Sequence, residues 1–204
     1  MKLLHVDSSV MGTQSVSRQL TAEIVAKLRQ AAPDLDVTYR DLAAEPVPHL
    51  SGSILAARQP AARQPSAAVD HDFVLSAKVL DEFLAADIVV IGAPMYNFGV
   101  PSQLKAWIDC LAVADKTFRY TETGMEGLAG GKRVIIASSR GGFYTGSSPM
   151  ASLDHQEAYL SGFFGFLGVT DIAFVHAEGV NISPEQRQRG IESALAEVAA
   201  LKAA

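Results

Sequence analysis

The stretch Ile88-Val89-Val90-Ile91-Gly92-Ala93-Pro94-Met95-Tyr96-Asn97-Phe98-Gly99 decides the fold, because it joins an apolar run to a short loop. Residues 88–91 are apolar without interruption, which is typical of a central parallel strand covered on both faces. The following loop is bounded by proline and glycine and contains Tyr96 and Phe98. Core aromatic residues usually lie within helices and strands, so this loop is a candidate ligand site. The alternative is that both rings are core residues within a turn.

Strand-like and helix-like runs alternate on both sides of this stretch. Short apolar runs occur at residues 3–6, 37–40, 133–137 and 172–175. Apolar residues at helical spacing mark residues 17–28, 70–85, 101–111, 152–167 and 184–201. This alternation predicts a parallel sheet with helices on both faces, and five strands favour the flavodoxin-like three-layer α/β fold with strand order 2-1-3-4-5. Ligands should then lie over the loops after the first, third and fourth strands.

Composition narrows the class of protein. The 204 residues suggest a single domain, residues 1–204, and 49% hydrophobic against 19% charged residues supports a large core. The net charge of −5, without a basic stripe, argues against a nucleic-acid partner. No apolar run reaches the roughly 18 residues of a membrane span. Because no signal peptide is visible and the single Cys110 fits a reducing compartment, we expect a cytoplasmic protein without a membrane partner.

Two segments exceed a minimal five-strand fold. Residues 43–69 are rich in Ala, Pro, Ser and Gln and contain the near-repeat Ala57-Arg58-Gln59-Pro60 and Ala62-Arg63-Gln64-Pro65. We interpret them as an insertion within the domain. Residues 117–132 contain several glycines and Tyr120, which indicates a hairpin-like excursion before the fourth strand. We expect this excursion to cover the ligand site.

The loop after the first strand, residues 8–17, leads directly into a helix. Amide groups at a helix N-terminus attract anions, and the hydroxyls of Ser9, Ser15 and Ser17 can add hydrogen bonds to a phosphate. Simple capping of the helix by serine is the alternative. Arg18 lies in the first turn, where the helix dipole disfavours a cation unless an anion offsets it, and this favours a bound phosphate. The loop lacks the Gly-Lys-Ser/Thr ending of a nucleoside-triphosphate loop.

The other two loops suit a flat ring. Met95, Tyr96 and Phe98 can hold a heteroaromatic ring, with backbone amides near Asn97 as hydrogen-bond donors. The loop after the fourth strand contains Ser139-Arg140-Gly141-Gly142, whose paired glycines let the backbone approach the edge of such a ring. Because all three loops lie at one edge of the sheet, they predict one site.

Three sets of residues carry a resemblance to a known family. They are Ser9 with Ser15-Val16-Ser17, Pro94-Met95-Tyr96-Asn97-Phe98 with Pro101-Ser102-Gln103-Leu104-Lys105, and Ser139-Arg140-Gly141-Gly142. Together they resemble the FMN-dependent NADH:quinone oxidoreductases, also called FMN-dependent azoreductases. The segment Phe118-Arg119-Tyr120-Thr121-Glu122 is similar to the excursion of the same family. The similarity extends over nearly the full chain.

The resemblance implies FMN as the bound cofactor and assigns its contacts. The FMN phosphate would contact Ser9, Ser15, Val16 and Ser17, the isoalloxazine ring Pro94, Met95, Tyr96, Asn97, Phe98 and Gly99, and the pyrimidine edge Ser139, Arg140, Gly141 and Gly142. Candidate pocket residues are Tyr120, Phe143, Tyr144 and Phe163. The resemblance further implies a homodimer with active sites at its interface, NADH or NADPH as electron donor, and quinones or azo compounds as acceptors.

We hypothesise a ping-pong mechanism in which the nicotinamide and the acceptor occupy one place in turn, while the flavin performs the electron transfer. Tyr120, Tyr144 or water can supply a proton. The alternative function is a flavodoxin-like electron carrier, or a regulatory flavin-binding protein, without NAD(P)H turnover. The modest net charge and the aromatic excursion favour the enzyme.

Other chemistries have little support in the sequence. Cys110 lies inside a predicted helix and is interpreted as a core residue. The histidines lack metal-ligand spacing, and no Gly-x-Ser-x-Gly elbow of a serine hydrolase occurs, so we expect no metal and no serine nucleophile. Gly162, Gly165 and Gly168 recur at every third position, and we interpret them as sites of close helix packing.

Overall fold

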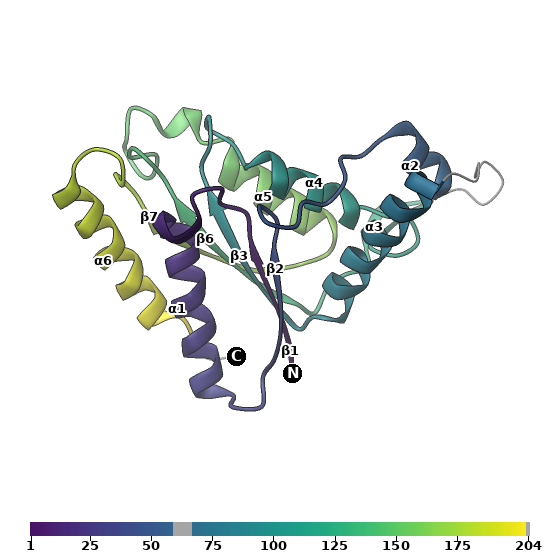
Figure 1. Ribbon diagram of the computed structural model, residues 1–204, viewed down its shortest axis with the longest axis horizontal. Coiled ribbons are helices and arrows are strands. Elements are labelled where there is room, and N and C mark those ends of the chain that lie inside the picture. Colours follow the sequence, from purple (N-terminus) through teal and green to yellow (C-terminus); the bar gives the residue numbers. More distant parts are fainter. Residues whose placement is uncertain (59–66, 203–204) are drawn as a thin grey trace.

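A five-stranded parallel sheet forms the centre of the computed structural model, which describes residues 1–58 and 67–202 and only the backbone of residues 67–70. The strands are β1 (Lys2–Asp7), β2 (Asp36–Asp41), β3 (Ile88–Pro94), β6 (Arg133–Ser139) and β7 (Asp171–Ala177). Their order is β2-β1-β3-β6-β7 and every neighbouring pair is parallel (Figure 1). This is the order 2-1-3-4-5 in the sequence of the sheet strands, so the predicted flavodoxin-like fold is confirmed.

Helices cover both faces of the sheet. One face packs against α1 (Val16–Ala31) and α6 (Pro184–Ala200), and the other against α3 (Ala67–Ala85), α4 (Ser102–Leu111) and α5 (Gln156–Phe166). The apolar stripe predicted for the first helix is buried, since Leu20, Ile24 and Leu28 are at most 2% exposed. On the other face, Phe83 contacts the rings of Trp107 and Phe164 at centroid distances of 6.2 and 6.3 Å.

The apolar run of β3 is buried for its whole length, as its sequence predicts. Side chains of a strand alternate between the two faces of a sheet. Accordingly Ile88 and Val90 pack with α1 and α6, whereas Val89 and Ile91 pack with α3, α4 and α5. Every position of the run therefore contributes to one of the two cores.

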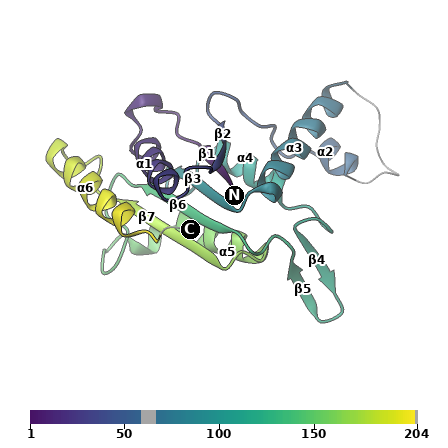
Figure 2. The same cartoon turned by 90° about the horizontal axis from the view of Figure 1, so that it is seen from below.

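The excursion before β6 contains an antiparallel hairpin of β4 (Phe118–Thr121) and β5 (Gly124–Gly127). Figure 2 shows the hairpin projecting from the body of the molecule. Because α4 carries the chain back across the sheet before the hairpin begins, the base of the hairpin lies at the amino edge of the strands. The loops after β1, β3 and β6 lie at the opposite edge. The expectation that the excursion covers the site of its own chain is therefore wrong.

The insertion at residues 43–69 contains a short helix, α2 (Gly52–Ala57), and its near-repeat continues into residues 59–66, which lie outside the described residues. The interpretation of the glycine triplet needs correction. A Cβ at Gly162 or Gly165 would meet no described atom within 4 Å, so neither allows close packing within the described chain. Gly168 has a φ of +92° and approaches Gly127, at the end of the hairpin, not another helix.

Candidate functional site

The serine loop connects β1 to α1 through a single helical turn, η1 (Gly12–Gln14). Ser15 is the N-cap of α1, and its hydroxyl accepts a hydrogen bond from the amide of Arg18 at 3.3 Å. The same hydroxyl lies 3.1 Å from that of Ser17, and the hydroxyl of Ser9 lies 3.2 Å from that of Tyr96. Capping and ligand binding are therefore compatible, because Ser15, which caps the helix, also lines a cavity together with Ser9.

Arg18 is paired within the protein. Its guanidinium donates to both carboxylate oxygens of Asp41, at 2.7 and 2.6 Å, and to the carbonyl of Ser9, at 3.2 and 2.8 Å. The bond to Asp41 is the main reason why the pKa of Arg18 is raised, and the bond from Arg18 the main reason why the pKa of Asp41 is lowered. The anion that offsets Arg18 is thus Asp41, and the sequence argument that Arg18 calls for a bound phosphate is wrong. Arg18 instead holds the serine loop.

A buried aspartate supports the same loop from below. Asp7, at the end of β1, accepts hydrogen bonds from the hydroxyls of Thr21 at 2.9 Å and Tyr39 at 3.1 Å. Burial and the charge of Asp7 raise the pKa of Tyr39 to about 12, so Tyr39 remains a donor at neutral pH. A side chain at Gly92 of the neighbouring β3 would place its Cβ 2.5 Å from the carboxylate of Asp7, which explains why glycine interrupts the apolar strand there.

The loop after β3 is a two-residue turn. Tyr96 and Gly99 exchange two backbone hydrogen bonds of 3.1 Å, and Asn97 and Phe98 between them have φ values of 49° and 68°. Positive φ at both central positions defines a type I′ turn, in which asparagine is well tolerated. A bulky residue such as Phe98 is disfavoured in this conformation by about 1–3 kcal/mol. Phe98 is 39% exposed, and its ring packs edge-on with that of Tyr144 at a centroid distance of 6.2 Å.

The loop after β6 divides into two parts with different roles. The side chain of Arg140 is completely buried and contacts Asp154 at 2.9 Å, Glu157 at 3.1 Å and Glu178 at 3.5 Å. Its guanidinium therefore faces the protein interior, and its backbone is paired as well, because its amide donates to the carbonyl of Ala177 at 2.8 Å and its carbonyl accepts from the amide of Val180 at 3.0 Å. The next residue, Gly141, accepts a hydrogen bond from the amide of Asn181 at 3.2 Å.

Gly141 and Gly142 present backbone donors. Among the described residues, the amides of both glycines donate to no acceptor. Buried or half-buried amides are normally paired, so these two are available to a ligand at the cavity wall. This arrangement agrees with the role that the sequence predicts for the paired glycines.

A cavity of about 180 Å³ lies between these loops. Its lining comprises Ser9, Met11, Gln14, Ser15, Val16, Pro94, Met95, Tyr96, Ser139, Gly141, Val180, Asn181 and Arg187. The structure thus brings together eight of the fourteen residues predicted to bind the cofactor. Of the other six, Asn97, Phe98 and Gly99 belong to the turn beside the cavity, Ser17 and Arg140 are buried, and Gly142 follows the lining residue Gly141.

Sequence reasoning missed five lining residues. Met11 and Gln14 belong to the serine loop, while Val180, Asn181 and Arg187 follow β7. The loop after β7 reaches the same edge of the sheet as the other three loops, so the rule that ligands lie beyond the carboxyl ends of parallel strands already pointed to it. None of the three motifs lies in this fourth loop, so the sequence contains no local signal for it.

The four candidate pocket aromatics separate into two pairs. Tyr144 contacts Phe98, and Phe143 lies against Gly179 in the loop after β7, so both are near the cavity. Tyr120 lies on the hairpin and is 78% exposed, and Phe163 stacks on another ring of α5. None of the four lines the cavity formed by the described part of the chain, and Phe143 lines a different cavity.

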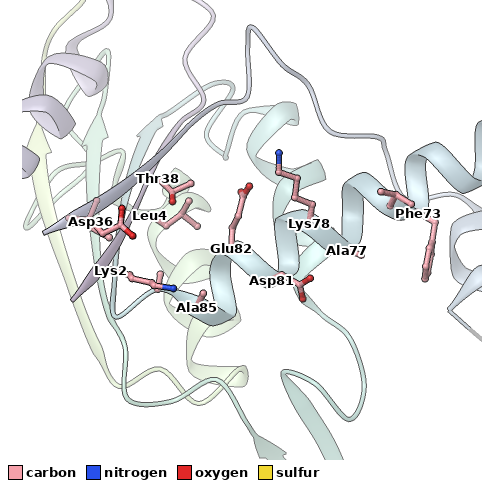
Figure 3. Close-up of a pocket in the computed structure, with 13 residues that line it drawn as sticks. Lys2, Leu4, Asp36, Thr38, Phe73, Ala77, Lys78, Asp81, Glu82 and Ala85 are labelled. Carbon is pink, nitrogen blue, oxygen red and sulfur yellow. The ribbon is translucent and has the colours of Figure 1, made fainter.

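A second cavity, of about 570 Å³, lies between α3 and the strands β1 and β2. Figure 3 shows Lys78 and Glu82 of α3 beside it, with Leu4 and Thr38 from the two strands. Glu82 is engaged by Arg40 through two hydrogen bonds of 2.8 Å. The cavity contains none of the predicted site residues, and we assign it no ligand despite its size.

Two absences hold for the described residues. No helix among them is both long and apolar enough to cross a bilayer. No group of three or more His, Cys, Asp or Glu side chains in the described ranges is arranged to hold a metal ion.

The donors of the smaller cavity suit a phosphorylated ring compound. Serine hydroxyls and a helix N-terminus at one end are ligands for a phosphate, and the thioether of Met95 and ring of Tyr96 provide apolar contacts for a flat ring. Fold and site together define a flavodoxin-like protein that binds a mononucleotide.

Comparison with known proteins identifies the family to which the chain belongs. The model of the flavodoxin-like fold family matches residues 1–201. An FMN-dependent NADH:quinone oxidoreductase of Methylocella silvestris is 54% identical over 204 residues, covering 100% of both chains. A protein of Xanthomonas euvesicatoria pv. vesicatoria with the same description, numbered 2, is 58% identical and covers 98% of this chain and 92% of its own. The chain belongs to the family of FMN-dependent NADH:quinone oxidoreductases, and the resemblance seen in its motifs is confirmed.

Solved structures agree with this assignment. An azoreductase of Bacillus anthracis superposes with a TM-score of 0.89 at 31% identity and covers 98% of this chain and 97% of its own. An FMN-dependent NADH-azoreductase of the same species, in complex with FMN, gives a TM-score of 0.87 at 27% identity, with coverage of 97% and 95%.

Proposed function

We propose that the protein is an FMN-dependent oxidoreductase that takes electrons from NADH or NADPH and reduces quinones and aromatic azo compounds. The observation that carries this proposal is the convergence of four loops on one cavity in a chain that matches a quinone oxidoreductase over its full length. The name of that relative specifies NADH and a quinone. Azo compounds as acceptors are supported by the azoreductases among the solved structures.

The cavity suggests how FMN is held. The hydroxyls of Ser9 and Ser15 would donate hydrogen bonds to the phosphate, which the N-terminus of α1 also attracts. Met95 and Tyr96 would contact the ring, and the unpaired amides at Gly141 and Gly142 would donate to its polar edge. When bound, FMN supplies the hydride and electron chemistry of the reaction. Hydrogen bonds to the edge where negative charge develops favour reduction, because they are preorganised by the protein.

The protein has two further tasks in this mechanism. The nicotinamide and the acceptor would bind beside the ring in turn, as in a ping-pong reaction, next to Phe98 and Tyr144. The Tyr144 hydroxyl is one source of the proton that the acceptor takes up, and water is the other. Neither requires a dedicated acid buried in the cavity.

A homodimer would complete the site. The ring of Tyr120 is 78% exposed on a hairpin that projects from the body of its own chain (Figure 2). Large exposed aromatic side chains often mark contacts with other proteins. We therefore assign Tyr120 to the partner's active site, in agreement with the family resemblance. We also place the enzyme in the cytoplasm, since a buried lone thiol at Cys110 suits a reducing compartment.

Anaerobic stopped-flow spectroscopy tests the proposal. The flavin-loaded protein should lose its yellow colour rapidly on mixing with NADH or NADPH and regain it on mixing with a quinone. A protein that binds FMN but is not bleached by either nicotinamide would be an electron carrier, not an oxidoreductase. Steady-state rates with both nicotinamides, against a quinone and an azo-dye panel, then rank donors and acceptors, and parallel double-reciprocal plots would support the ping-pong order.

The loop assignment has its own test. The double variant Ser15→Ala/Phe98→Ala should bind FMN more weakly than the wild type. Ser51→Ala is the matched control, since Ser51 caps α2 in the same way as Ser15 caps α1 but does not line the cavity. If the double variant retains FMN as tightly as the control, these loops do not hold the flavin.

A further inference from the structure

Arg187 is the one charged residue among the described residues that line the cavity. It lies in the first turn of α6, and its Nη2 donates a hydrogen bond of 2.8 Å to the carbonyl of Gln14 in η1. The two residues are 173 positions apart in the chain, so this contact joins the last helix to the serine loop. Arg187 thus lies at the same end of the cavity as Ser15 and Val16.

The charges around the serine loop leave a phosphate without a counter-ion from that loop. Asp7 and Asp41 carry two negative charges there, against one positive charge on Arg18, which lies 3.8 Å from Asp7 and is bonded to Asp41. His5, 3.4 Å from Asp7, adds a positive charge only when it is protonated. A phosphate monoester carries about −1.5 to −2 charges at pH 7. It would therefore enter an environment that is already negative on its β1 and β2 side.

Arg187 is free to supply the missing charge. Within the described ranges, no carboxylate lies within 4.0 Å of its guanidinium, and its side chain makes a hydrogen bond only to the uncharged carbonyl of Gln14. That bond uses one of the five N–H donors of the guanidinium. The others match the oxygens of a phosphate, for which the planar fork of arginine is well suited.

We propose that Arg187 binds the FMN phosphate and makes the site select FMN over riboflavin. The inference rests on the proposed function, since it assumes that the cavity holds a flavin. Serine hydroxyls and helix amides can bond to a neutral hydroxyl as well as to a phosphate. A positive charge distinguishes the two, because riboflavin has no charge at this end.

The test compares flavins that differ only in the phosphate. Dissociation constants of FMN and riboflavin are measured by fluorescence quenching on flavin-stripped, full-length wild type, Arg187→Gln and Arg187→Lys. Glutamine retains a donor for the Gln14 carbonyl but removes the charge, and lysine retains the charge. Arg189→Gln is the matched control, since Arg189 lies on the same helix but lines a different cavity. The Michaelis constant for NADH is measured on each flavin-saturated protein.

Arg187→Gln should weaken FMN binding by roughly 10- to 100-fold, the range of a hydrogen bond to a charged group. Riboflavin binding should not change, Arg187→Lys should retain most of the preference, and Arg189→Gln should behave as wild type. The advantage of the wild type over Arg187→Gln should also shrink in high salt.

Three results would overturn the inference. Arg187→Gln binds FMN as tightly as wild type; it loses FMN and riboflavin affinity equally, which indicates a purely structural role; or it changes only the Michaelis constant for NADH, which assigns Arg187 to the nicotinamide. In all three the wild type still binds FMN, so the proposed function survives. A wild type that binds no FMN overturns the proposed function and this inference with it.

Discussion

Replacing Arg140 by methionine should destabilise the protein strongly, although Arg140 is not exposed to any ligand. Its side chain is 0% exposed, while its partners Asp154 and Glu178 are each 12% exposed and Glu157 is 37% exposed. Arg140→Met leaves these carboxylates close together without a cation. Breaking a buried ion pair by removing one partner typically costs about 3–5 kcal/mol. We expect about 4 kcal/mol, because two of the three carboxylates are nearly buried and the third is partly solvated.

Urea unfolding of the flavin-free protein, followed by circular dichroism, measures this loss without the stabilising effect of bound FMN. Arg133→Met is the matched control, since Arg133 begins the same strand but its carboxylate partner, Asp171, lies 3.8 Å away and is 65% exposed. The control should lose about 1 kcal/mol, as for a surface ion pair with one further hydrogen bond, here from the Arg133 guanidinium to the carbonyl of Lys202 at 2.7 Å.

The buried charges also predict non-additivity. Glu178→Gln should destabilise the wild type, where it removes a partner of Arg140, but should have less effect or stabilise in the Arg140→Met background, where it removes an uncompensated charge. The reasoning is refuted if Arg140→Met loses no more stability than Arg133→Met, or if the effects of Arg140→Met and Glu178→Gln simply add.

Three further predictions concern the backbone and the serine loop. Phe98→Gly should have a free energy of unfolding about 1 kcal/mol higher than that of Phe98→Ala, although glycine is usually less stabilising than alanine. Both variants lack the ring, but only glycine relieves the strain of a φ of 68°. Equal stabilities in urea would show that the turn is not strained. Asp41→Asn should destabilise the protein at pH 7, and its difference in stability from the wild type should shrink below about pH 4. The reason is that Arg18 lowers the pKa of Asp41, so the stabilisation by the Asp41 carboxylate is lost as the pH falls through that lowered value. A difference that is constant between pH 7 and 3 contradicts this. Gly127→Ala should cost about 1–3 kcal/mol in the same urea assay, since its Cβ would lie 2.2 Å from a backbone nitrogen of the loop after α5. Gly162→Ala, with open space around its Cβ, should be neutral or stabilising.

The architecture was predictable because it follows from patterns that repeat along the chain. The run at residues 88–91 must be buried on both faces, and the alternation of strands and helices leaves few topologies for a parallel sheet. The hairpin occurs where the sequence predicts it, but it does not cover the site of its own chain, for a topological reason. Its aromatic residues suggested a lid, but a segment that follows α4 and precedes β6 begins and ends at the amino edge of the sheet.

The charges of the site were less predictable than its motifs. Arg18 stands beside the serines in sequence, so it seemed to report a bound anion, yet its partner Asp41 comes from the next strand. Arg140 belongs to a motif assigned to the flavin edge, yet its guanidinium is paired with three carboxylates from elsewhere in the chain. Arg187 belongs to no motif, and it is the arginine that lines the cavity. Motif residues were located by local sequence, but the pairing of a charge depends on residues that only the tertiary fold brings together.

The loops are also tied to one another around the cavity. The Ser9 and Tyr96 hydroxyls join the first loop to the second, at 3.2 Å, and the amide of Met95 joins the second to the third through the Ser139 carbonyl, at 2.8 Å. The amide of Asn181 links the loops after β6 and β7, and the contact between Arg187 and Gln14 returns to the first loop.

Two of these four links join backbone to backbone, so they persist when side chains change and leave no mark in the sequence. Each is worth about 1 kcal/mol, and together they hold the walls of the cavity in place before a ligand arrives. Even a substitution at Arg187 that lost the contact with Gln14 would leave the other three links intact, which is why its effect should appear in the affinity for a phosphate and not in the fold. The same set of links holds the strained turn at Asn97 and Phe98, because the amide of Met95, just before the turn, is hydrogen-bonded to Ser139 of β6.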